Sequence, residues 1–182
     1  MVLGSVFLGS SAANFAVLLA RVWVGIMILA HGWRHLKSVR SGPGMANWFE
    51  SLGVRPGHLH AWSVTLTELV FPFLLFLGFL TPIAYGGVCA LMLVALMTNH
   101  RQNGFFLSSA KEGYEYVLTV AVLAISLGTL GPGKWSLDHA FDLSVPFEPK
   151  KALVVTAVVG IIGAALFLLV FWRPPQREDP AA

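Results

Sequence analysis

The chain has 182 residues, of which 56% are hydrophobic and only 12% are charged, and its formal net charge is +3. Soluble domains carry about 25% charged residues, so this composition, with a mean hydropathy of +0.73, indicates an integral membrane protein. The basic residues are spread over loops and a tail without forming a stripe, which argues against nucleic acid as a partner. The single cysteine, Cys89, excludes an internal disulfide.

Five apolar stretches are long enough to cross a bilayer, which takes about 20 residues of helix. In chain order they are Ala12–His31, Trp62–Leu80, Pro82–Thr98, Tyr114–Leu130 and Ala152–Trp172. The second and third are joined at Thr81-Pro82, so they are predicted to form an antiparallel hairpin. We expect an all-α membrane protein built on a four-helix transmembrane bundle, with an additional fifth C-terminal transmembrane helix.

The organisation along the chain follows from these spans. Residues 1–145 are predicted to form the four-helix domain, and residues 146–182 the fifth helix with a short disordered cytoplasmic tail. The loop 32–61 contains apolar residues at helical spacing, which predicts a short helix in the membrane interface. These residues are Met45, Trp48, Phe49 and Leu52.

Basic residues outside the spans predict the orientation. One side holds Arg34, Lys37, Arg40, Arg55, Arg101, Lys111, Arg173 and Arg177, and the other holds only Lys134, Lys150 and Lys151. This asymmetry favours a plasma-membrane protein whose N-terminus lies outside and whose C-terminus lies in the cytoplasm. Small residues four apart in the last span (Thr156, Gly160, Ala164) suit close helix packing, either within the chain or in a homo-oligomer.

Ionisable residues inside the spans are the candidates for function. A charged side chain near the bilayer centre costs about 2.5–3.5 kcal/mol, so Arg21 and Glu68 are expected to face the bundle interior and to have partners. Because successive helices run in opposite directions, His31, Glu68, His100 and Glu115 are all predicted to lie in the same half of the membrane.

Helix patterns add two expectations about this polar cluster. Two sets of residues each share one helix face: Glu115, Thr119 and Ser126 on the fourth span, and Cys89, Leu93, Leu96 and His100 on the third. Pro72 has no N–H to donate to the carbonyl of Glu68, which predicts a kinked helix with a free carbonyl in the cluster.

Three interpretations of the cluster compete. In the first it is structural: Arg21 pairs with Glu68 or Glu115 and the network sets helix register. In the second it binds a polar head group such as a quinone, with Arg21 or a histidine donating to the carbonyls while the carboxylates and His31 handle protons. In the third, two Glu and two His bind a metal.

Metal and haem are the weaker alternatives. Carboxylate-bridged metal sites in helical bundles use a Glu three residues before a His on one helix, and no such pair occurs here. A haem held by His31 and His100 would lie half outside the bundle, so we predict neither group. At the level of the whole protein, a transporter or a membrane scaffold that recruits other proteins through its loops is an alternative to redox work.

Several motifs resemble those of the DoxX family of small membrane proteins, and most closely its actinobacterial-type branch. They are Arg21 followed by the segments 31–36 (HGWRHL), 67–68 (TE), 77–82 (LGFLTP), 103–106 (NGFF), 112–116 (EGYEY), 131–133 (GPG) and 136–138 (SLD). The resemblance covers about residues 12–140. Here His35 stands where a lysine is common in the family, and the fifth span lies outside the four-helix pattern.

The resemblance implies a four-helix transmembrane bundle and quinone-linked redox work in a complex with other protein subunits. The family's name comes from a subunit of a terminal quinol oxidase, and relatives form part of a thiosulfate:quinone oxidoreductase. Some actinobacterial members belong to a membrane oxidoreductase complex that responds to oxidative and thiol stress. The family's polar positions carry over onto Arg21, His31, Glu68, His100 and Glu115, with a membrane quinone as the expected cofactor.

Overall fold

The computed structural model describes residues 10–108 and 112–175, and within these ranges all regular elements are helical apart from one isolated β-bridge. The α-helices are α2 (Ser11–Arg40), α3 (Gly44–Ser51), α4 (Gly57–Leu77), α5 (Thr81–Ala95), α6 (Glu115–Leu130), α7 (Leu137–Ala140), α8 (Pro149–Ala157) and α9 (Gly163–Phe171). Two π-helical segments, η1 (Leu96–His100) and η3 (Val158–Ile162), continue α5 and join α8 to α9, and η2 (Val145–Phe147) is a 3-10 turn. The all-α prediction is confirmed; the tail beyond residue 175 and Lys111 lie outside the described residues.

In the described part of the chain, four helical stretches are long and apolar enough to cross a membrane: Ser11–Arg40, Gly57–Leu77, Thr81–His100 and Pro149–Phe171. The expected fourth span, Tyr114–Leu130, corresponds to α6, which has 16 residues. At 1.5 Å per residue it is about 24 Å long, whereas a hydrocarbon core is about 30 Å thick. Of the expected spans, α6 is therefore the shortest, whereas the C-terminal helix Pro149–Phe171 is long enough to cross a membrane.

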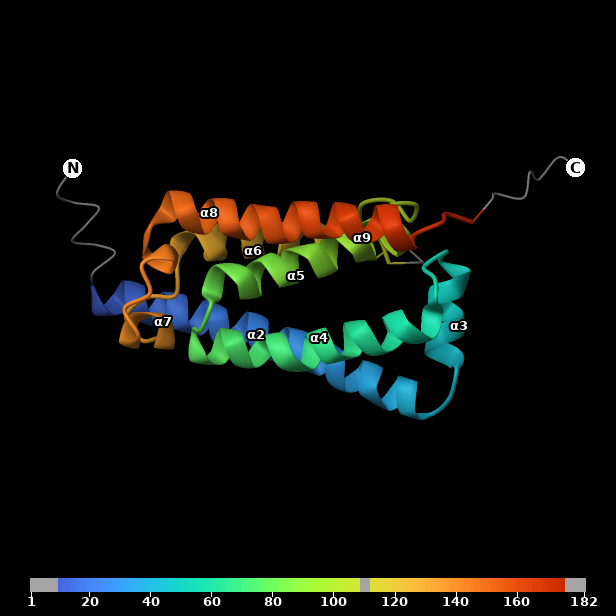
Figure 1. Cartoon of the computed structure of the whole chain (residues 1–182), viewed down its shortest axis with the longest axis horizontal. Helices are drawn as coiled ribbons and strands as arrows, with labels where there is room; N and C mark the ends of the chain where they lie inside the picture. The colour runs from blue at the N-terminus through green and yellow to red at the C-terminus, as the bar shows by residue number, and fades with distance from the viewer. Residues whose placement is uncertain (1–9, 109–111, 176–182) are drawn as a thin grey trace, which may run out of the picture.

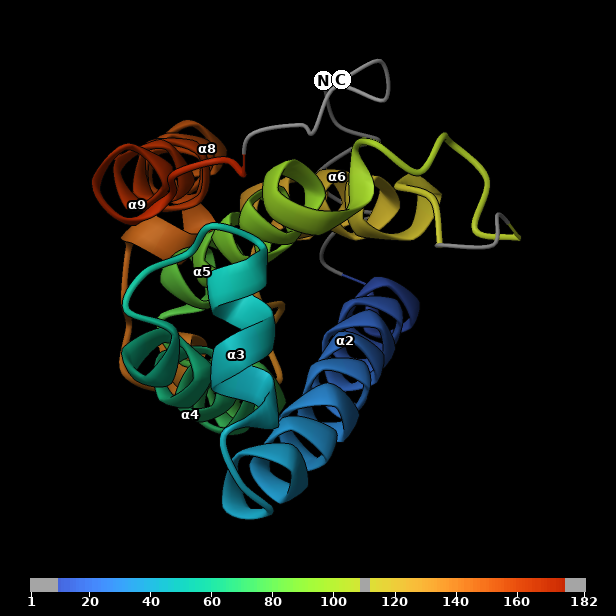
Figure 2. The ribbon, with the colours of Figure 1, turned by 90° about the vertical axis from the view of Figure 1, so that its right-hand side faces the viewer.

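The long helices form two groups that pack along a common direction. α2 and α4 lie antiparallel in one group, and α5, α6 and the α8–α9 helix form the other (Figure 1). The predicted interfacial helix is present as α3, which crosses one end of the bundle (Figure 2). The core between the groups is built from apolar residues such as Ile28, Leu75, Tyr85, Val88 and Ala121.

Helix ends follow the local sequence. The Ser10 hydroxyl accepts from the Ala13 N–H at 3.2 Å and so caps α2. Gly78 ends α4 in the left-handed conformation, with φ of 62°. α2 continues to Arg40, nine residues beyond the predicted end at His31. α4 is a continuous helix through the buried Pro72.

The C-terminal helix packs tightly against α5. Its small-residue positions Thr156, Gly160 and Ala164 are buried. The Thr156 hydroxyl donates to the Pro82 carbonyl at 3.1 Å, and a Cβ added to Gly160 would lie 2.9 Å from Cys89 Sγ. The small-residue stripe is therefore used within the chain.

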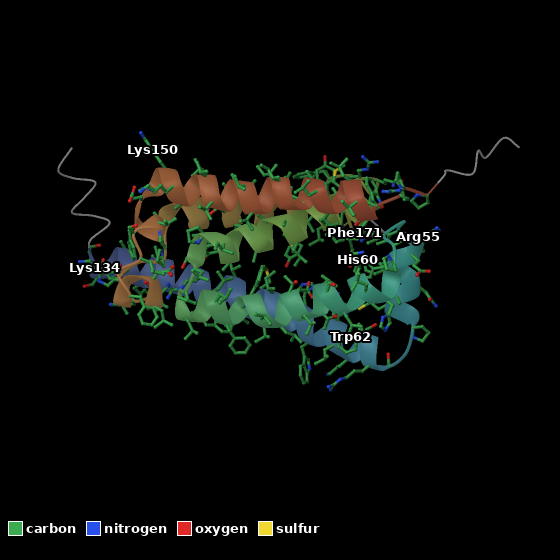
Figure 3. The ribbon with its side chains drawn as sticks, viewed as in Figure 1. Arg55, His60, Trp62, Lys134, Lys150 and Phe171 are labelled. Carbon is green, nitrogen blue, oxygen red and sulfur yellow. The ribbon has the colours of Figure 1, made fainter. Side chains whose placement is uncertain are left out.

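The end of α9 is also joined to the loop between α3 and α4. The Arg55 N–H donates to the Phe171 carbonyl at 3.0 Å, and the Arg173 N–H donates to the Gly53 carbonyl at 2.8 Å. Figure 3 shows Arg55, His60 and Phe171 at this end of the molecule and Lys134 and Lys150 at the opposite end. The last helix thus belongs to the bundle and is fixed at its C-terminal end.

Candidate ligand site

Arg21 and the other polar residues of the predicted cluster are separated in the structure. Arg21 is fully buried, and its guanidinium donates to the carbonyls of Pro132 at 2.6 Å and Trp135 at 2.7 Å, on the loop after α6. The expected pairing of Arg21 with Glu68 or Glu115 is wrong. The reason is that loop carbonyls at the level of Arg21 accept from its Nη1 and Nη2 atoms, in the place where a carboxylate partner was expected.

The Arg21 region is a structural junction. Asp138, which is fully buried, accepts from the Leu80 N–H at 2.7 Å and the Thr81 N–H at 3.0 Å. These are orphan donors at the start of α5, and a carboxylate is a strong cap for them. Gly78 leaves room for the guanidinium, since a Cβ there would overlap Arg21 Nη1. This region therefore holds together the ends of α4, α5 and α6.

Glu68 is 4% exposed and pairs with His35 of α2, whose Nδ1 lies 2.5 Å from Glu68 Oε2. The atoms meet without the alignment of an ordinary hydrogen bond, and the contact is an ion pair when the imidazole is protonated. Gly32 lets α2 and α4 approach closely enough for His35 to reach Glu68, because a Cβ at this position would lie 2.8 Å from the carbonyl carbon and oxygen of Glu68. The predicted carbonyl of Glu68 thus faces α2 at its closest approach to α4.

This pair lies at a cavity of about 480 Å³, which we call the Glu68 cavity. Its walls come from α2, α3, α4, the α5–η1 helix and the start of α6 with its preceding loop. The polar lining includes His31, Arg34, His35, Glu68, His100, Glu112 and Tyr116, and the apolar lining includes Met45, Trp48, Phe49, Leu91 and Met92. The cavity is therefore apolar for most of its wall, with a carboxylate–imidazole pair at one place.

Three of the five predicted site residues line this cavity: His31, Glu68 and His100. His31 is exposed and stacks on Tyr116 of α6, with ring centroids 6.3 Å apart. His100 Nδ1 lies 2.9 Å from the Glu112 carbonyl, and its Nε2 lies 3.3 Å from the Asn99 amide nitrogen. These contacts fit a neutral ring that donates from Nδ1 and accepts at Nε2, so His100 also fixes the loop before α6.

Glu115 is not among the residues that line the cavity. Its Oε2 accepts from the Leu107 N–H at 3.1 Å, so it holds the loop that precedes α6. The other polar residues of its predicted stripe, Thr119 and Ser126, are exposed. The stripe faces away from the bundle because α6 packs on α5 through its small residues, such as Ala121 and Ala124.

The face predicted for α5 is also wrong in part. Cys89 lies against Gly160 of the last helix, whereas His100 lines the cavity. Eleven residues of regular α-helix would place both on one face. The π-helical segment η1 has more residues per turn than an α-helix, so His100 is rotated away from the face of Cys89.

Sequence reasoning missed His35 as a site residue. The signal was present, because His31 and His35 are four residues apart and share one face of any helix that continues past His31. Arg34 was missed because it lies beyond the predicted end of the first span, and Tyr116, which lies inside the fourth, because only charged residues and histidines were weighed. Among the described residues, no group of three or more His, Cys, Asp or Glu is arranged to hold a metal ion.

Comparisons with known proteins agree with the architecture. The sequence model of the DoxX family matches residues 16–101, which cover α2 to η1 and include Arg21, His31, Glu68 and His100. An uncharacterised protein of Haemophilus influenzae is 31% identical over 126 residues, which are 63% of this chain and 82% of the relative. No solved structure matches the chain. The chain has a bundle of apolar helices, carries the family's motifs and is similar to this relative. It therefore belongs to the DoxX family of membrane proteins.

Proposed function

We propose that this chain is a membrane subunit of a quinone-linked oxidoreductase or redox-stress complex, and that the Glu68 cavity binds the head group of a membrane quinone. The observation that carries the proposal is a buried carboxylate paired with an imidazole at the edge of a largely apolar cavity. Small-molecule sites have about 300–1,000 Å³ and a few convergent polar groups in apolar walls. A volume of about 480 Å³ fits this description.

A quinone supplies two-electron redox chemistry coupled to protons, and the electrons come from another subunit of the complex. The residues of this chain supply the proton side. Protonated His35 would donate to a carbonyl oxygen of the head group, and Glu68 would stabilise the positive charge on the imidazole ring of His35. His31, which is exposed at the cavity wall, exchanges protons with water. The aromatic rings of Trp48 and Tyr116 give the flat head group apolar contacts.

In the same proposal the chain crosses the membrane five times, with its N-terminus outside and its C-terminus in the cytoplasm. The Glu68 cavity then lies in the cytoplasmic half. Support comes from the eight basic residues that the sequence places on that side. The surface of the bundle meets the lipid, as the many exposed apolar side chains of α2, α4 and α9 suggest.

The direct test is extraction of quinone from protein purified in mild detergent, with Glu68→Gln as the test variant. Glu115→Gln is the matched control, because Glu115 is not among the cavity-lining residues and a glutamine oxygen can still accept from the Leu107 N–H. We expect near-stoichiometric quinone in the wild type and the control, and its loss in Glu68→Gln. Equal trace amounts in all three proteins would contradict the proposal and make the scaffold role the leading one.

A second comparison tests the partner of Glu68. His35→Phe keeps a flat ring but removes the donor, and His35→Lys restores a cation beside the carboxylate. We expect quinone affinity to fall about tenfold or more in His35→Phe, which is roughly 1.4 kcal/mol or more, and to recover in His35→Lys. Recovery measured by equilibrium binding would separate a charge role from a packing role; equal loss in both variants would favour packing.

A further inference from the structure

The Glu68 cavity has a closed inner end and an open mouth. Glu68 and Met92 in its lining are buried, whereas Arg34, Trp48 and Leu107 are exposed. A ligand that reaches the carboxylate therefore enters past Arg34 on α2 and past the loop that precedes α6.

The end of the bundle next to the cavity is covered by α3. This helix crosses that end (Figure 2) and lines the cavity with Met45, which is buried, and with the half-buried Phe49. In the same view the near end of α2 diverges from α6. Deeper in the bundle the two helices meet through the stacked rings of His31 and Tyr116. The mouth thus lies at the side of the bundle, between α2 and the loop before α6.

That loop presents three consecutive large apolar side chains to the outside. Phe105, Phe106 and Leu107 are 45%, 65% and 49% exposed. The backbone is fixed in this arrangement: the Glu115 N–H donates to the Phe105 carbonyl at 2.8 Å, and the Gly113 N–H donates to the Phe106 carbonyl at 3.1 Å. A held loop with outward aromatic residues, next to the end of several apolar helices, is typical of a segment that lies in a membrane surface.

We propose that the Glu68 cavity opens sideways into the bilayer beneath this loop, and that the ligand is a long-tailed quinone whose apolar tail leaves through the mouth into the lipid. Phe105, Phe106 and Leu107 insert into the membrane surface and keep the mouth at the level of the acyl chains. The inference rests on the proposed function for the nature of the head group. It adds the source of the ligand, which is the membrane and not the water.

The position of the loop is tested without any quinone. Single cysteines at Phe106→Cys and Leu107→Cys, in a Cys89→Ala background, are labelled with a fluorophore in phosphatidylcholine–phosphatidylglycerol nanodiscs. Ser51→Cys on α3 is the water-facing control, and Leu66→Cys, whose native side chain is 53% exposed on α4, is the lipid-facing control. We expect both loop labels to be quenched by nitroxide-labelled lipid and protected from iodide, as at Leu66. Iodide quenching equal to that at Ser51 would overturn the inference.

The route of the tail is tested by blocking the mouth. A bulky maleimide at Leu107→Cys is expected to weaken binding of a long-tailed quinone at least about tenfold while a short-chain analogue binds as before. Equal binding of both by the labelled protein, or equal loss of both, would overturn the lateral route. Failure of the unlabelled protein to bind either compound would contradict the proposed function itself, and the quenching result would still decide the position of the loop.

Discussion

Two charged residues of the predicted spans, Arg21 and Glu68, are both buried but have different partners. The guanidinium of Arg21 donates to the backbone carbonyls of Pro132 and Trp135, in the loop after α6. Glu68 is paired with a side chain, His35, and its pairing opens onto a cavity. A buried group satisfied by backbone is typical of a structural role, whereas one beside a cavity is available to a ligand.

Arg21→Met tests this division of roles. The change leaves two buried carbonyls without donors and removes the cation near Asp138, so we expect a loss of roughly 3–5 kcal/mol in the free energy of unfolding. Thermal unfolding in detergent, followed by circular dichroism, measures it. Arg34→Met, at an exposed position of the same helix, is expected to unfold at the wild-type temperature. An unchanged unfolding temperature in Arg21→Met would mean that Arg21 is not structural.

At single residues, the cost of burying a charge pointed to Arg21 and Glu68 but not to their partners. The sequence marks Arg21 and Glu68 because charge inside an apolar stretch is conspicuous. It cannot mark the carbonyls of Pro132 and Trp135, since every residue has one. His35 was hidden because the apolar signal of the first span ends at His31, although the helix does not.

Among the elements, α2 and α4 form the wall that carries the Glu68–His35 pair. Their approach is set by Gly32, where a Cβ would lie 2.8 Å from the backbone carbonyl of Glu68. Backbone atoms cannot move aside as a flexible side chain can. A side chain at this position therefore has to separate the two helices.

Gly32→Ala is expected to destabilise the protein by about 1–3 kcal/mol, as overpacking does elsewhere, and to weaken quinone binding by moving His35 away from Glu68. Gly163→Ala is the matched control, because a Cβ there meets nothing within 4 Å. In the control, alanine's better helix propensity should leave stability unchanged or raise it by up to about 1 kcal/mol. Similar unfolding curves for the two variants would refute a close contact at Gly32.

Apart from the C-terminal end of α2, helix positions were predictable to within a few residues because apolar length is a strong signal, and the motif Thr81-Pro82 marked the α4–α5 turn. Helix faces were less predictable. A π-helical segment such as η1 has no clear sequence signature, yet it turns His100 toward the cavity and away from Cys89. On α6 the small residues, and not the polar ones, proved to be the buried face.

For the whole molecule, the packing bears on whether α6 crosses the membrane despite its 16 residues. The loop after α6 lies with the N-terminal ends of α2 and α5: the Lys134 N–H donates to Asn14 Oδ1 at 2.6 Å, and Asp138 caps α5 at Thr81. The loop before α6 follows directly from η1, at the other end of α5. If α2 and α5 both cross, the two ends of α6 belong to opposite sides of the membrane.

Cysteine labelling tests this directly. In a Cys89→Ala background, Gln102→Cys lies before α6 and Ser144→Cys lies after it, and we expect an impermeant maleimide to reach the first only from the cytoplasmic side and the second only from outside. Ser51→Cys at the end of α3 should label from the same side as Gln102→Cys, because Gly53 is hydrogen-bonded to Arg173 after α9 and Arg101 lies over the neighbouring Trp172 ring. Labelling of Gln102→Cys and Ser144→Cys from one side would mean that α6 does not cross. A crossing of about 24 Å is shorter than the usual core of about 30 Å, a mismatch that local thinning of the bilayer around α6 accommodates.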